Sequence, residues 1–122
     1  MSNPPYILLV DDDLPVLRFM QEALEEGGYE VTATTSGTSA LAIIKERLPD
    51  LLILDLNMPE PDGFDILKTE RSQFPDLKIL VISGYLTGVL LDAATFVGAI
   101  GTIEKPFAPD ALVAKVRDAL EK

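Results

Sequence analysis

The chain has 122 residues, with 20 acidic side chains, 10 basic ones and a formal net charge of -10. This length suits a single domain, and the negative charge disfavours direct binding to nucleic acid or to an anionic membrane. The chain lacks cysteine and histidine, which excludes disulfides, thiolate or imidazole catalysis, and any metal site built from these residues. A metal would therefore need oxygen ligands.

The first predicted strand is the apolar run Tyr6–Val10. A helix is expected to follow it, because Leu17, Met20 and Leu24 recur at helical spacing and form one apolar stripe. Gly27-Gly28 should end this helix, since glycine is common just after the last helical turn.

The same alternation continues along the chain. Tyr29–Ala33 is predicted to be an amphipathic strand, and Leu41, Ile44 and Leu48 should form the apolar stripe of a second helix. The remaining predicted strands are Leu51–Leu54, Lys78–Ile82 and Ala99–Ile103, and the remaining predicted helices are Phe64–Gln73, Thr87–Val97 and Pro109–Leu120.

Five alternating strands and helices predict an α/β fold in which helices cover both faces of a parallel sheet. We expect one domain over residues 1–122, with its core at about 6–120 and no output domain in this chain. The apolar runs are too short to span a membrane, and the N-terminus lacks the basic start of a signal peptide. These features predict a cytoplasmic protein.

Polar residues follow the predicted strands at the sheet edge where doubly wound folds bind ligands. They are Asp11-Asp12-Asp13, Asp55, Ser83 and Glu104-Lys105-Pro106. Taken singly, each Asp or Ser83 is typical of a turn or a helix cap, and Lys105 of a solvated surface charge. With a strand order of 2-1-3-4-5, however, Asp11, Asp12 and Asp55 would face one another across a crevice, where their repulsion costs stability unless a cation or protons offset it.

Carboxylate oxygens that are partly open to solvent suit Mg2+, which often completes its shell with phosphate oxygens. The ammonium of Lys105 and the hydroxyl of Ser83 could hold phosphate oxygens on the other side. The sequence therefore predicts a phosphoryl site.

Four segments resemble those of response-regulator receiver domains, and the resemblance runs from Tyr6 to Leu120. The segments are Ile7–Asp13, Leu54–Pro59 with Asp62-Gly63, Val81–Gly84 and Glu104–Phe107. The resemblance implies a flavodoxin-like three-layer (βα)5 sandwich with a doubly wound five-stranded sheet. It also implies a phosphorylation-dependent switch that catalyses only its own phosphorylation and dephosphorylation.

The resemblance implies a role for each matching residue. Asp55 matches the phosphoacceptor, Asp12 a direct Mg2+ ligand, Asp11 a ligand acting largely through water, and Asn57 the residue whose backbone carbonyl completes the set. Mn2+ is expected to substitute for Mg2+.

Further positions match the residues that contact the phosphoryl group. Ser83, followed by Gly84, resembles the hydroxyl residue that closes on this group, and Lys105 resembles the cation that pairs with it. Lys105-Pro106 resembles the family's cis peptide, which Pro106 makes accessible.

Two positions modify this pattern. Many family members have Tyr or Phe as a rotamer switch where this chain has Thr102, so the usual aromatic switch is absent. Tyr85 lies where family members control water access to the phosphoryl group, and slower hydrolysis or simple packing would both explain its ring.

Leu91 and Phe96 flank the apolar stripe of the predicted helix Thr87–Val97. They are either buried under neighbouring loops or exposed as a contact surface. In the second case, the family resemblance suggests an output face formed by the fourth helix, fifth strand and fifth helix.

The expected partners are a sensor histidine kinase or phosphotransfer protein, a downstream effector or fused output domain, and a second copy of the chain in a phosphorylation-linked homodimer. One alternative is a Mg2+-dependent phosphohydrolase of the haloacid-dehalogenase kind, but this chain offers Asp55-Leu56-Asn57 on its third strand where that class has Asp-x-Asp after its first. The other alternative is a degenerate receiver that serves as a constitutive docking module, which is disfavoured by the intact set Asp11, Asp12, Asp55, Ser83 and Lys105.

Overall fold

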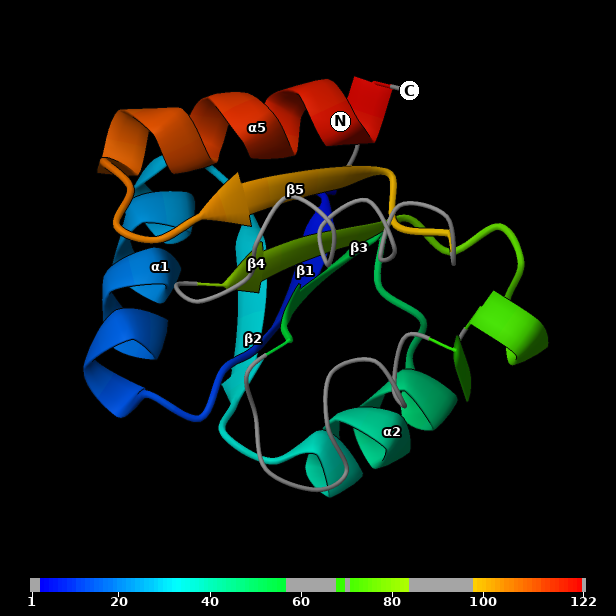
Figure 1. The fold of residues 1–122 in the computed structure, drawn as a ribbon. Helices are drawn as coiled ribbons and strands as arrows, with labels where there is room; N and C mark the ends of the chain where they lie inside the picture. The colour runs from blue at the N-terminus through cyan, green and yellow to red at the C-terminus, as the bar shows by residue number, and fades with distance from the viewer. Residues whose placement is uncertain (1–2, 57–67, 70, 84–97, 122) are drawn as a thin grey trace.

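The computed structural model describes residues 3–56, 68–69, 71–83 and 98–121, and it contains a five-stranded sheet (Figure 1). All neighbouring strands pair in parallel, in the order β2-β1-β3-β4-β5. The strands are β1 (Tyr6–Val10), β2 (Glu30–Thr34), β3 (Leu51–Asp55), β4 (Ile79–Ser83) and β5 (Gly101–Glu104). The predicted strands and their order are confirmed, with ends shifted by no more than two residues.

The strand side chains alternate between two apolar layers, as expected for a sheet covered on both faces. Leu8 and Val10 of β1 belong to the cluster that contains Ile44 of helix α2 (Gly37–Glu46). Ile7 and Leu9 belong to the opposite cluster, with residues of α1 (Leu14–Glu26) and α5 (Pro109–Glu121). Figure 1 shows α2 on one side of the sheet and α1 and α5 on the other, which makes three layers.

The first predicted helix is confirmed, since Leu17, Met20 and Leu24 are all buried in α1. The last predicted helix is also confirmed, because α5 begins at Pro109. The helix predicted over 64–73 is described only at 68–69 and 71–73, which are helical, and the helix predicted over 87–97 lies outside the described residues.

The predicted apolar stripe of α2 is wrong at Leu48. The helix ends at Glu46, and the side chain of Leu48 is 50% exposed. Arg47 adopts an extended conformation with φ -152, and Leu48 precedes Pro49, a context that disfavours helical backbone. Local backbone restriction therefore stops the helix before the periodic pattern ends.

No helix in the described part of the chain is long and apolar enough to cross a membrane.

The end of α1 is fixed by two consecutive glycines. The N–H of Gly28 donates to the carbonyl of Glu25 at 3.0 Å, and the N–H of Tyr29 donates to the carbonyl of Leu24 at 3.1 Å. This is a Schellman ending, which needs a left-handed residue after the cap. Gly28 has φ +94, whereas Gly27 is right-handed with φ -76.

The two glycines should therefore respond differently to alanine. Gly28→Ala should lower the free energy of unfolding by about 1 kcal/mol, because an added Cβ strains the left-handed backbone although the space around it is open. Gly27→Ala should leave that free energy unchanged or raise it by up to about 1 kcal/mol. Urea denaturation of both variants would measure the difference, and equal effects would contradict the assignment of the left-handed position.

Candidate functional site

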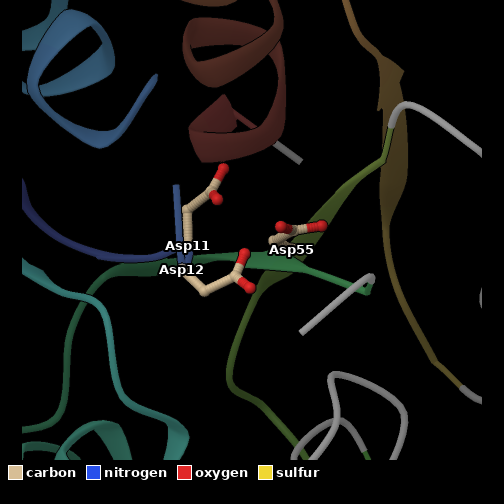
Figure 2. A group of neighbouring side chains, drawn as sticks. All are labelled: Asp11, Asp12 and Asp55. Atoms are coloured by element: carbon tan, nitrogen blue, oxygen red, sulfur yellow. The ribbon is translucent and has the colours of Figure 1, made fainter. Parts of the chain in front are cut away.

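Three carboxylates gather where β1 and β3 end. The register pairs Val10 with Leu54, so Asp11 and Asp55 continue two adjacent strands at the same sheet edge. The side chains of Asp11, Asp12 and Asp55 each offer an oxygen within 4.8 Å of the other two. Figure 2 shows Asp11 and Asp12 leading in different directions from adjacent backbone positions, with Asp55 beside them.

Asp11 is fully buried, with 0% exposure. Its Oδ1 accepts a hydrogen bond from the N–H of Asp13 at 2.9 Å, which fixes the carboxylate at the start of the loop into α1. Its Oδ2 lies 2.9 Å from Nζ of Lys105 as an ion pair that is not aligned as a hydrogen bond. Among the described residues, this buried oxygen accepts no hydrogen bond.

The neighbours of Asp11 have different environments. Asp13 caps α1, and its Oδ1 accepts from the N–H of Val16 at 3.4 Å, so the cap interpretation holds for this residue. Asp12 is exposed, and its carboxylate belongs to the cluster with Asp11 and Asp55. The three consecutive aspartates therefore have different environments: Asp11 is buried, Asp12 is exposed and Asp13 caps α1.

Asp55 is the last residue of β3 and is only 1% exposed. It is opposite Ile82 of β4, one residue before Ser83, so β4 brings Ser83 to the same edge. Nζ of Lys105 lies 3.5 Å from Oδ2 of Asp55 and donates to it.

Lys105 follows β5 directly and reaches both buried carboxylates. Burial by itself lowers the pKa of Lys105, but the close contact with Asp11 and the charge of Asp55 outweigh it, so this pKa lies above its usual value. Lys105 is therefore a cation at neutral pH. The Lys105-Pro106 peptide bond is cis, as the resemblance implied.

The residues present fit a Mg2+ ion. All the candidate ligand atoms are carboxylate oxygens, and Oδ2 of Asp11 is buried without a hydrogen bond in the described structure, although it is paired with Lys105. Two oxygens bound to one Mg2+ can lie at most about 4.2 Å apart, so small side-chain rotations would suffice. The three carboxylates also lie close enough together to repel one another, and a divalent cation would reduce this repulsion.

The structure describes some of the remaining predicted site residues and not others. Thr102 is half-buried in β5 opposite Val81, and Pro106 is exposed. Asn57, Gly84, Tyr85, Leu91 and Phe96 lie outside the described residues.

One contact near the site was not predicted. The ring of Phe107 lies 6.0 Å from that of Phe19 on α1, between centroids, and ties the loop after Lys105 to the first helix. Phe107 belongs to the motif around Lys105, but the sequence pattern gave no sign of Phe19 as its partner.

A sequence profile described as "Response regulator receiver domain" matches residues 7–117. The chain is 35% identical over 122 residues to the C4-dicarboxylate transport transcriptional regulatory protein DctD of Rhizobium meliloti (strain 1021), covering 100% of this chain and 26% of DctD. It is 33% identical over 121 residues to the response regulator SaeR of Staphylococcus aureus (strain USA300), covering 96% of this chain and 51% of SaeR. The chain thus spans about a quarter and about half of the length of these relatives.

Solved structures of similar proteins have the same fold as this chain. A putative response regulator from Chloroflexus aurantiacus J-10-fl superposes with a TM-score of 0.91 at 35% identity, covering 98% of this chain and 99% of that one. The receiver domain of NtrX from Brucella abortus gives a TM-score of 0.90 at 34% identity, covering 95% and 98%.

The similarity extends over nearly the whole chain, and it agrees with the observed strand order and with the acidic edge between β1 and β3. The comparisons favour neither the phosphohydrolase nor the constitutive docking module. The chain belongs to the response regulator receiver domain family, whose members are phosphorylation-dependent switches of two-component signalling rather than classical enzymes.

Proposed function

We propose that Asp55 is the phosphoacceptor of this switch. The observation that supports this most directly is its buried carboxylate, which ends β3 beside the Lys105 ammonium and within the aspartate cluster. The acceptor is thus held at the carboxyl edge of the sheet, where ligands of this architecture bind.

The reaction needs only a nucleophile, positioning and charge neutralisation. A carboxylate oxygen of Asp55 attacks the phosphorus of a phosphohistidine or of acetyl phosphate and forms a P–O bond. The bond from phosphorus to the donor's nitrogen or oxygen breaks, and its electron pair leaves with the donor. The product is a mixed anhydride, and no general base is required because the nucleophile is a carboxylate.

The acidic residues supply the metal site in this proposal. Asp12 would bind Mg2+ directly, Asp11 would act largely through water, Asp55 would contribute an oxygen, and the backbone carbonyl of Asn57 would complete the protein's share. Mn2+ substitutes. When bound, the ion neutralises negative charge on the transferred phosphoryl group. Asp11 remains paired with Lys105, which limits its freedom to move.

Ser83, Gly84 and Lys105 receive the phosphoryl oxygens in this proposal. Ser83 ends the strand next to β3, and Lys105 is already 3.5 Å from Asp55. Tyr85 controls water access, Pro106 shapes the loop after Lys105, and Thr102 leaves room where many receivers carry an aromatic ring.

Residues 6–120 act as one receiver unit in the cytoplasm, in our proposal, and catalyse only their own phosphorylation and dephosphorylation. The donor is a sensor histidine kinase or phosphotransfer protein, and the output is an effector protein or fused domain. Neither nucleic acid nor membrane is contacted directly. DctD is described as a transcriptional regulatory protein, which is consistent with a receiver that controls a separate output.

The acceptor assignment is tested by mass. Wild-type protein incubated with acetyl phosphate and Mg2+ should gain one phosphoryl group, and Asp55→Asn should gain none. Omitting Mg2+ should abolish labelling of the wild type. Asp50→Asn, which changes a carboxylate at the opposite sheet edge, serves as the control. Equal labelling of wild type and Asp55→Asn would refute the assignment.

Asp12 should matter for chemistry and not for the metal-free fold. Asp12→Ala should abolish labelling, because a direct metal ligand is lost. In EDTA its melting temperature should equal or exceed that of the wild type, since an exposed carboxylate is removed from a repelling cluster. Asp11→Ala should instead melt lower, by roughly 4 °C or more, because Lys105 and the N–H of Asp13 lose a buried partner. A clearly lower melting temperature for Asp12→Ala would reveal a structural role.

The output face is proposed to include Leu91 and Phe96 together with β5 and α5. Phosphorylation should promote self-association or effector binding through these side chains, whose burial could contribute a few kcal/mol. Sedimentation with and without beryllofluoride, a phosphoryl mimic, should show a larger species only with the mimic. The Leu91→Ser/Phe96→Ser variant should still accept phosphate at Asp55 but remain monomeric. Association equal to that of wild type would exclude this face.

A further inference from the structure

Lys105 directly follows β5, a strand with few side chains that could fix its register. In the described part of the sheet, β5 is an edge strand of four residues that pairs with β4. Gly101 has no side chain, Thr102 is half-buried and Glu104 is exposed, so Ile103 is the one large apolar side chain that β5 buries. Register depends on such side chains, and this strand specifies its own weakly.

The site nevertheless requires one register. Glu104 pairs with Ser83, and this pairing brings Lys105 within 2.9 Å of Asp11 and 3.5 Å of Asp55. A slip by one residue would move Lys105 by about 3.3 Å and turn its side chain to the other face of the sheet. Both ion pairs would then be lost.

The start of β5 is held by an arginine from another part of the chain. Nη2 of Arg71 donates to the carbonyl of Gly98 at 2.7 Å, and its Nη1 donates to the carbonyl of Pro75. The planar guanidinium thus joins the segment before β4 to the segment before β5. From Gly98 the chain needs only two residues to begin pairing, since the N–H of Ile100 donates to the carbonyl of Ile79 at 2.8 Å.

Gly98 is matched to this contact in two independent ways. Its φ of +129 is rarely adopted by residues with a side chain, and a Cβ here would lie 2.5 Å from Nε of Arg71. That Nε is buried and makes no hydrogen bond within the described structure. Packing of the guanidinium against Gly98 therefore leaves Nε without a hydrogen bond, which costs stability. This cost suggests that the contact serves to hold Gly98 in position.

We propose that Arg71 is a positioning residue for the phosphoryl-transfer site: by fixing Gly98 it sets the register of β5 and so holds Lys105 against Asp55. This inference rests on the proposed function of Asp55 and Lys105. Arg71 touches no reacting group, and its effect on the chemistry passes through Lys105.

The test uses the full chain and two measurements. In Arg71→Ala, amide hydrogen exchange of residues 100–104 should accelerate at least about tenfold, while the amides of β1 and β3 keep their protection. Labelling by acetyl phosphate at saturating Mg2+ should slow about tenfold, because Lys105 is no longer held in place. Arg117→Ala, at an exposed arginine of α5, should match the wild type in both measurements.

A Lys105→Ala background separates positioning from general destabilisation. There, Arg71→Ala should change the labelling rate by less than about twofold, because the two residues act in series. Slowing by the same factor in both backgrounds would overturn the proposal, and so would unchanged exchange in β5. If Arg71→Ala does not fold, Gly98→Ala and Arg71→Lys replace it, since each disturbs the same contact and should give the same pattern. A wild type that takes no phosphate would refute the role of Asp55, while the exchange measurement would still decide whether Arg71 fixes β5.

Discussion

Two carboxylates, Asp11 and Asp55, are buried side by side at one sheet edge, with the ammonium of Lys105 within 3.5 Å of both. Buried charged groups are costly unless they are paired, and Lys105 is paired with both of these carboxylates. Asp12 adds a further carboxylate at the exposed side of the same cluster. The three carboxylates are close enough together to repel one another, and their oxygens are ligands of the kind that a divalent cation prefers.

The sheet explains how such a site can exist in a small domain. β1 and β3 lie next to each other and are buried on both faces by α1, α5 and α2. Their apolar interiors leave no place for a polar side chain until the strands end, and parallel pairing puts both ends at the same edge. The acidic residues are thus concentrated by the architecture and not by local sequence alone.

The cationic side chain, Lys105, directly follows the edge strand β5. Lys105 is held at one end by its ion pairs and by the contact between Phe107 and Phe19, and we infer that Arg71 secures the other end of β5 through Gly98. Lys105 is thus held from both sides, by its own ion pairs and by the strand that precedes it. Such an arrangement suits a phosphorylation-dependent switch, in which a reaction at one edge of the sheet must change the surface of the domain.

The sequence by itself determined the strand and helix alternation, the ends of α1 at Gly27-Gly28, and the identity of the acidic and basic residues at the strand ends. These features are local: periodicity, glycine after a helix, and polar residues after apolar runs. Tertiary structure decided which of three consecutive aspartates is buried, which is exposed and which caps α1, because neighbouring strands and the first helical turn assign each a different environment. It also ended α2 before Leu48 and paired Arg71 with Gly98, 27 residues away. Contacts between residues far apart in the sequence form only when the chain folds, so the spacing of apolar residues along the sequence does not predict them.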